Sequence, residues 1–260
     1  MMNRSDMSIL NVFIVEIRML GWELKRYLFN TGAMVVVMYI IFLGMFWGAK
    51  SIAGVGINQS SLDSMVIGYV LWMSAMFSLQ GTGSVVLSES QRGTLEQIYL
   101  SPYGADIIFF FKAITNTLFN FVILTLMLYL TMLTTGRILS VNLLYFYLIL
   151  FVSVLSLNGI GFMLGGVGLI HKKIGAVNGI LSFGLIGLML LPVYPLTAFS
   201  FLPFVAGAHT INAHIVHGTS FPLWWYLFVI GNSLLYLFIG LSIFRLFERK
   251  AKRLNKMGQY

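Results

Sequence analysis

Long apolar runs separated by short polar segments dominate the pattern of the chain. A run of about 18 or more apolar residues is typical of a helix that crosses a bilayer. We therefore predict an all-α polytopic membrane protein with six spanning helices in a transmembrane domain of residues 31–246. The predicted spans are residues 31–49, 64–88, 105–134, 141–170, 174–197 and 221–244.

The segments outside these runs have other patterns. In residues 8–30, apolar and charged positions fall on opposite halves of a helix. This predicts a cytoplasmic N-terminus followed by an amphipathic helix, within residues 1–30, that lies in the membrane interface. Residues 198–220 are moderately apolar but broken by Pro203, Gly207 and Gly218, and residues 247–260 form a basic tail.

Composition and charge support this interpretation. Hydrophobic residues make up 58% of the chain and charged residues 9%, against about a quarter charged in ordinary soluble domains. The net charge of +8 does not indicate nucleic acid, because the basic residues lie near the ends of apolar runs and in the tail. The positive-inside rule places both termini and the segment around Arg92 in the cytoplasm, and residues 198–220 outside. The sequence has no cysteine, and we expect no cleavable signal peptide.

The charged stretch ESQRGTLEQIYLSP, residues 89–102, interrupts the apolar pattern. Gly93 suits the C-terminal cap of the preceding span. Thr94 suits an N-cap, with Gln97 at the spacing of a capping box, and Pro102 suits the first position of the next helix. We predict a short, rigid helix here. Its charged and apolar side chains suit docking to a soluble partner, whereas the alternative is an ordinary capped turn with interfacial aromatic residues.

The run E-x-x-x-G-T-L-E-x-x-x-x-S-P resembles the signature of the type-2 ATP-binding-cassette (ABC) exporter permeases. In that family the segment follows the second span and forms a coupling helix that fits a groove on an ATPase subunit. The resemblance implies a coupling helix at about residues 89–101, and a re-entrant segment at about residues 198–220. The ATPase-coupling residues that it implies are Glu89, Arg92, Gly93, Thr94, Leu95, Glu96, Ser101 and Pro102.

The resemblance also implies a function. The chain would be a permease subunit that forms a translocation path as a dimer, with a second copy or a close paralogue, in a bacterial or archaeal plasma (inner) membrane. It would contact membrane lipids and be no enzyme itself, since ATP and Mg would bind to the separate ATPase subunit. Glycolipid, polysaccharide, lipid, drug and ion all remain open as substrates. Tyr99 and Leu100 depart from the aliphatic residues expected before the Ser-Pro step.

Two other classes of function stay open. One is an ion- or proton-coupled carrier that works without an ATPase, and the other is a membrane scaffold that transports nothing. The sequence has no phosphate-binding loop of the G-x-x-x-x-G-K-[ST] type. It also has no acidic residue near a predicted midplane, which favours an external ATPase over a proton relay.

Polar side chains inside the predicted spans form two stripes. Gln80, Ser84 and Ser88 follow one face of the second span, and Lys112, Asn116 and Asn120 follow one face of the third. Gln80, Ser84, Asn116 and Asn120 are candidates for a conduit, but hydrogen bonds between helices explain them more simply. We expect Lys112 to extend to the cytoplasmic surface.

Glycine, histidine and aromatic residues form further patterns in the sequence. Small residues at Gly161, Gly165, Gly175 and Gly179 predict close packing of the fourth span on the fifth. His209, His214 and His217 match no zinc spacing, so we predict no metal site. No catalytic constellation is present. Aromatic candidates for a pathway are Tyr69, Trp72, Phe77, Tyr145 and Phe146.

Overall fold

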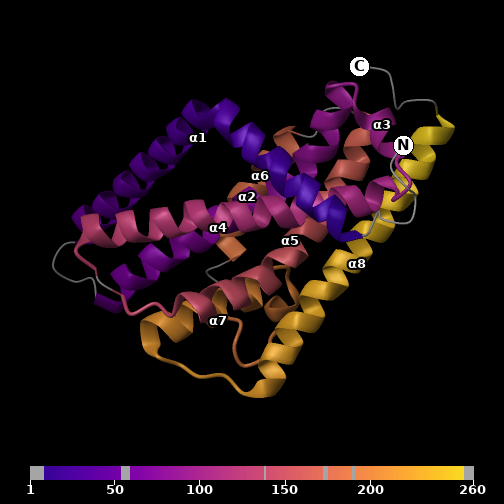
Figure 1. Cartoon of the computed structure of the whole chain (residues 1–260). Helices are drawn as coiled ribbons and strands as arrows, with labels where there is room; N and C mark the ends of the chain where they lie inside the picture. The colour runs from indigo at the N-terminus through magenta and orange to yellow at the C-terminus, as the bar shows by residue number, and fades with distance from the viewer. Residues whose placement is uncertain (1–8, 54–58, 138, 172–174, 189–190, 255–260) are drawn as a thin grey trace.

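The computed structural model describes residues 9–53, 59–137, 139–171, 175–188 and 191–254 (Figure 1). Within these ranges the regular elements are helices, and no strand is present. In chain order they are α1 (Ile9–Ala53), α2 (Gln59–Gln91), α3 (Leu95–Tyr99), α4 (Ala105–Thr135), α5 (Leu143–His171), α6 (Gly175–Leu188), the 3₁₀ helix η2 (Ala198–Phe201), α7 (Val205–His217) and α8 (Leu223–Arg253).

Five helices of the described part, α1, α2, α4, α5 and α8, are long and apolar enough to cross a membrane. The all-helical fold predicted from the sequence is therefore confirmed, and these five helices are compatible with the predicted polytopic membrane protein. The predicted fifth span is wrong as drawn, because α6 has 14 residues and ends at Leu188 instead of continuing to Thr197. Its length of about 21 Å is short of a bilayer core. Pro192 and Pro195 follow, and proline stops a helix by removing a backbone donor.

The predicted interface helix and first span are joined in one helix, α1, which bends at Tyr27. The backbone of Tyr27 is non-helical (φ −112°, ψ 21°), and Figure 1 shows the bend. Apolar residues of the N-terminal half, including Ile14 and Ile17, are exposed. The kink therefore separates the amphipathic half from the apolar half near the predicted boundary.

α5 is the centre of the bundle and packs against α2, α7 and α8. It crosses α8 closely, because a Cβ added at Gly240 would overlap the backbone of Gly159. The prediction that Gly161 and Gly165 pack on the fifth span is wrong. A Cβ at Gly161 would lie 2.7 Å from the Cβ of Thr82 on α2, whereas nothing lies within 4 Å of one at Gly175.

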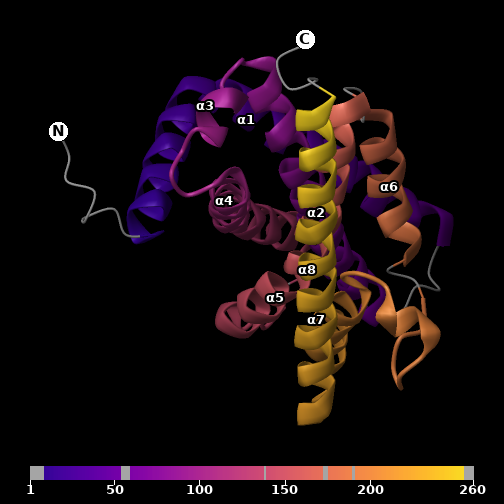
Figure 2. The ribbon, with the colours of Figure 1, turned by 90° about the vertical axis from the view of Figure 1, so that its right-hand side faces the viewer.

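α3 and the C-terminal end of α8 lie at one end of the bundle, and α7 lies at the other (Figure 2). α7 is seated closely on α5, since a Cβ at Gly207 would overlap the Ser153 side chain. The Trp225 indole of α8 donates a hydrogen bond of 2.7 Å to the Thr210 hydroxyl of α7. Residues 198–220 thus form two short helices braced by the long ones, as their broken pattern suggested.

Candidate functional site

The junction between α2 and α4 begins with a glycine cap. Gly93 has a φ of +74°, a conformation that glycine adopts without a steric penalty. Its backbone N–H donates to the Ser90 carbonyl (3.2 Å), and that of Thr94 donates to the Glu89 carbonyl (3.1 Å). These are the two hydrogen bonds of a Schellman motif. The predicted role of Gly93 as the cap of the second span is confirmed.

Glu89 is buried at this cap instead of lying on its surface. One of its carboxylate oxygens lies 2.5 Å from the Lys112 ammonium group of α4, and the other accepts a hydrogen bond from the Thr94 hydroxyl. The side chains of Glu89 and Lys112 are only 8% and 16% exposed. Two predictions are therefore wrong: Lys112 does not extend freely to the surface, and Thr94 does not form a capping box with Gln97, because its hydroxyl is bound to Glu89.

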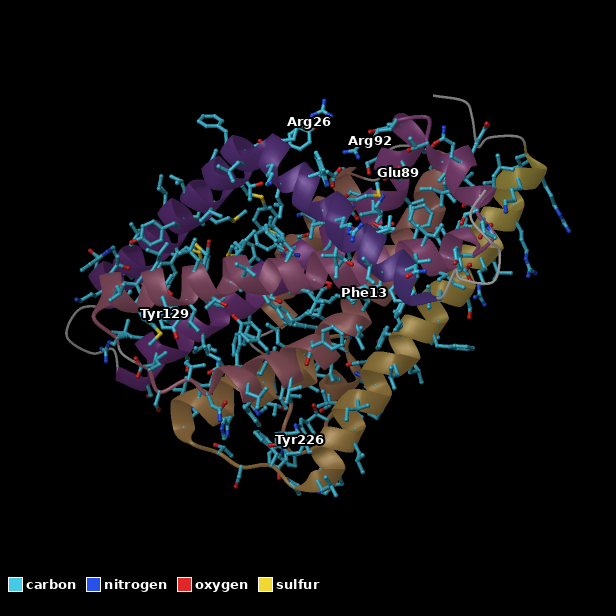
Figure 3. All side chains as sticks on the ribbon, viewed as in Figure 1. Phe13, Arg26, Glu89, Arg92, Tyr129 and Tyr226 are labelled. Carbon is cyan, nitrogen blue, oxygen red and sulfur yellow. The ribbon has the colours of Figure 1, made fainter. Side chains whose placement is uncertain are left out.

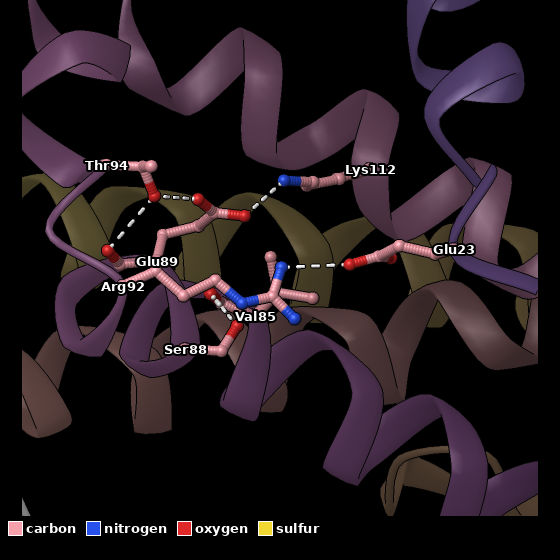
Figure 4. A network of polar contacts seen from close by, with 7 residues as sticks. All are labelled: Glu23, Val85, Ser88, Glu89, Arg92, Thr94 and Lys112. Carbon is pink, nitrogen blue, oxygen red and sulfur yellow. Dashed lines mark hydrogen bonds and ion pairs between the residues drawn. The ribbon is translucent and has the colours of Figure 1, made fainter. Parts of the chain in front are cut away.

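Arg92 links the junction to the N-terminal half of α1. Its guanidinium Nη1 lies 2.8 Å from Glu23 Oε1, and Figure 4 shows this ion pair beside the Glu89–Lys112 pair. Both side chains of the outer pair are about half exposed, at 52% for Arg92 and 47% for Glu23. Water screens such a pair, so it orients α1 relative to α2 with little net stabilisation.

α3 has a buried side and an exposed side. Leu95 is buried and belongs to a cluster that includes Phe109 of α4 and Phe244 and Ala251 of α8. Glu96 and Gln97 are exposed, and Leu100, which follows α3, is 85% exposed. Leu95, one of the apolar side chains predicted to suit docking, therefore faces the bundle in this structure.

The end of α3 is held by the basic extension of α8. The Lys252 ammonium group lies 4.2 Å from the centroid of the Tyr99 ring, a cation–π contact. The Tyr99 hydroxyl is buried and has no hydrogen-bond partner among the described residues, and burial raises its pKa. Nearby, Arg245 of α8 pairs with Asp106 of α4. Both contacts tie α8 to the junction.

The Ser-Pro step forms a turn and does not open the next helix. The Gly104 N–H donates to the Ser101 carbonyl at 3.3 Å, which places Pro102 at the second position of the turn, where its fixed φ is favourable. Gly104 has a φ of +80°, and α4 begins only at Ala105. The prediction of Pro102 as the first helical residue is wrong by three positions.

A cavity of about 130 Å³ lies behind this junction, between α1, α2 and α4. Its lining includes Glu16, Glu89, Lys112 and Asn116. Glu16 is 6% exposed, although it lies on the charged half of the amphipathic helix predicted within residues 8–30. The packing of Phe13 on Phe111 of α4, at 5.8 Å between ring centroids, turns this side of α1 towards the bundle.

The predicted polar stripes face different neighbours. Gln80 donates a hydrogen bond of 3.1 Å to Ser182 of α6, which confirms the interhelical explanation at this position. The Ser84 hydroxyl donates to the Gly81 carbonyl of its own helix. Asn116 lines the cavity beside α1, and Asn120 is half-buried.

The sequence reasoning missed a buried polar node at Asn158 of α5. Its side-chain oxygen accepts hydrogen bonds from Ser78 (2.5 Å) and Thr82 (2.9 Å) of α2, and its nitrogen lies 3.5 Å from the Thr117 hydroxyl of α4. An amide in the middle of an apolar span was the available signal, because such a group usually bonds to another helix.

A second cavity, of about 330 Å³, lies beside the N-terminal half of α2. Tyr69 and Trp72 line it together with Phe42 and Asn212. The other aromatic candidates do not line it: Phe77 and Phe146 are buried in the core, and the Tyr145 hydroxyl lies 3.0 Å from that of Tyr226.

The three histidines lie on α7 and make separate contacts. His214 Nδ1 lies 3.1 Å from the Thr219 carbonyl oxygen, and the His209 ring packs near Phe221. His217 lines a small cavity with His209. Across the described ranges, no group of three or more metal-ligating side chains converges.

Comparisons with known proteins add no identification. No family model matches the chain, and no curated protein matches it.

Proposed function

We propose that this chain is the transmembrane permease subunit of an ATP-driven exporter of the type-2 ABC class. A separate ATPase subunit would bind ATP and Mg and dock on α3. Two permease copies, or this chain and a close paralogue, would form the translocation path between them. The transported substrate stays open.

The observation that carries this proposal is the way in which α3 is attached. A free surface helix of five residues would be only a marginal structure. Here its start is fixed by Glu89, which is paired with Lys112 of α4. Its end is held by Lys252 of α8, and Arg92 connects the preceding cap to α1. A push on α3 would therefore act on α1, α2, α4 and α8 together.

The two sides of α3 have separate roles in this proposal. Glu96, Gln97 and Leu100 face outwards and would contact the ATPase groove. Glu89 and Leu95 face inwards and would transmit its movement. Both termini and α3 would lie in the cytoplasm, as the distribution of basic residues favours.

The path would run along the second cavity, lined by Tyr69 and Trp72. The Tyr69 hydroxyl donates a hydrogen bond of 2.5 Å to the Met38 carbonyl, and the Trp72 indole donates one of 3.0 Å to the Ser182 carbonyl of α6. These bonds connect the cavity wall to α1 and α6. η2 and α7 would form a re-entrant segment at the outer side of the membrane.

Site-specific cross-linking tests the docking surface. The natural sequence has no cysteine, so Gln97→Cys provides a single reactive thiol on the exposed side of α3. Thr219→Cys, exposed beyond the C-terminal end of α7, is the matched control. We expect a cross-link to a nucleotide-binding subunit from residue 97 only. In the same membranes, Glu96→Arg should weaken co-purification of that subunit about tenfold, whereas Lys25→Glu on α1 should not.

The opposite results would refute the proposal. These are labelling of the residue 97 thiol from outside the cell, or cross-links from residue 219 alone. Substrate transport by the purified chain in vesicles without any ATPase would instead identify an ion- or proton-coupled carrier.

A further inference from the structure

Another recess lies at the α1 kink, beside the C-terminal end of α2. It has a volume of about 550 Å³ and is lined by Trp22, Glu23, Arg26, Tyr27 and Arg92. Tyr27 is the kinked residue. Arg26, next to the bend, and Arg92, directly after α2, therefore line the same recess. Figure 3 shows both arginines at the same end of the molecule.

The recess contains two guanidinium groups and one carboxylate, so its formal charge is +1. Arg92 already pairs with Glu23. Arg26 packs over the Tyr27 ring at 5.5 Å, and in the described ranges it has no carboxylate partner. Arginine binds phosphate through two parallel hydrogen bonds, and Arg26 retains its donors for such a ligand.

The surroundings of the recess indicate its depth in the membrane. Trp22 is 77% exposed and Phe29 is 90% exposed. Large aromatic residues with this exposure, at the start of an apolar span, are typical of the headgroup level of a bilayer. The apolar half of α1 begins directly after the kink, at Thr31. We therefore expect the two arginines to lie near the level of the lipid phosphates.

We propose that this recess binds the phosphate group of an anionic membrane phospholipid. Arg26 and Arg92 donate hydrogen bonds to the phosphate oxygens, and the rings of Trp22 and Tyr27 flank the glycerol and the upper acyl chains. The positive charge of the recess favours an anionic headgroup over a zwitterionic one. The phosphate competes with Glu23 for Arg92, so lipid binding loosens the ion pair between α1 and α2. This proposal does not require an ATPase partner.

Lipid binding to the purified full chain tests the site. The probe is dioctanoyl phosphatidylglycerol, added to delipidated protein in detergent and quantified by native mass spectrometry. Loss of one charge-assisted contact predicts an affinity about tenfold lower for Arg26→Gln and for Arg92→Gln. Lys25→Gln is the matched control, because Lys25 is exposed next to Arg26 but does not line the recess. It should change the affinity less than about threefold.

A fourth variant separates this site from a general effect of surface charge. Glu23→Gln removes the carboxylate that competes with the phosphate for Arg92. It should therefore raise the affinity for the lipid above that of the natural chain. This rise should be larger than the loss of affinity in Lys25→Gln. Equal losses in Arg26→Gln and Lys25→Gln, or an unchanged affinity in Glu23→Gln, would overturn the proposal. Complete displacement of the lipid by an equal concentration of inorganic phosphate would assign the recess to free phosphate instead. If Arg92→Gln fails to fold, Arg26→Gln decides alone, because Arg26 has no ion pair within the described ranges that its loss would break.

Discussion

Replacement of Glu89 by glutamine should destabilise the protein strongly. Glutamine has the same shape and can still accept the hydrogen bond from Thr94. It has no charge, however, and the Lys112 ammonium group, now 2.5 Å from a carboxylate oxygen, would lose its ion pair. Lys112 is only 16% exposed, so water cannot fully replace the lost partner.

The size of the effect follows from the burial of the pair. Removal of one partner from a buried ion pair costs about 3–5 kcal/mol. The lower end applies here, because Glu16 lines the same cavity and offers Lys112 a second carboxylate. About 3 kcal/mol corresponds to a melting temperature about 6–12 °C lower for a chain of this size. Glu23→Gln breaks the half-exposed pair with Arg92, and it should cost less than about 1 kcal/mol.

Thermal unfolding in detergent, followed by the fluorescence of the five tryptophans, measures both variants under identical conditions. A double-mutant cycle with Lys112→Met then isolates the pair. The loss of unfolding free energy in the double variant should be at least about 1 kcal/mol smaller than the sum of the losses in the two single variants. The reason is that each single change leaves a buried group without its partner. Additive losses, or equal shifts for Glu89→Gln and Glu23→Gln, would refute the reasoning.

Two further predictions concern the packing of α5. Gly240→Ala should lower stability by about 1–3 kcal/mol, because the new methyl group overlaps the Gly159 backbone. The control is Gly231→Ala on the same helix, where a Cβ would have nothing within 4 Å. Equal melting temperatures of the two variants would contradict the close crossing of α5 and α8. Asn158→Leu should cost about 1–2 kcal/mol by removing the acceptor shared by two hydroxyls of α2. Asn120→Leu should be close to neutral in the same unfolding assay, and equal losses in both variants would show that the Asn158 node contributes nothing specific.

Several elements could be predicted from the sequence because one local property determines them. The third predicted span, residues 105–134, corresponds to α4 at Ala105–Thr135, since the length of an apolar run and its flanking turns fix a helix. Gly93 was correctly assigned as a cap because a positive φ strongly favours glycine. The division of α1 near Tyr27 follows from the point at which charges stop recurring along the chain.

Other features depend on partners that are distant in the sequence. Lys112 is 23 positions from Glu89, and Phe244 and Ala251 of α8, which cover Leu95, lie far from it in the sequence. Local patterns therefore assigned both Glu89 and Leu95 to the surface. The prediction of the fifth span was wrong for a different reason. It relied on the apolar composition of residues 174–197 and gave too little weight to the two prolines that follow α6.

The burial of Glu89 changes what the charged stretch can offer to a partner. If Glu89 and Leu95 were used for docking together with Glu96, the junction would lose its ion pair with Lys112 and its buried leucine. In the structure the stretch is divided: Glu89 and Leu95 are buried, while Glu96 and Leu100 are exposed. Substitutions on the two sides should therefore fail differently. An inward change should lower stability before any partner is added, and an outward change should weaken only the bound complex.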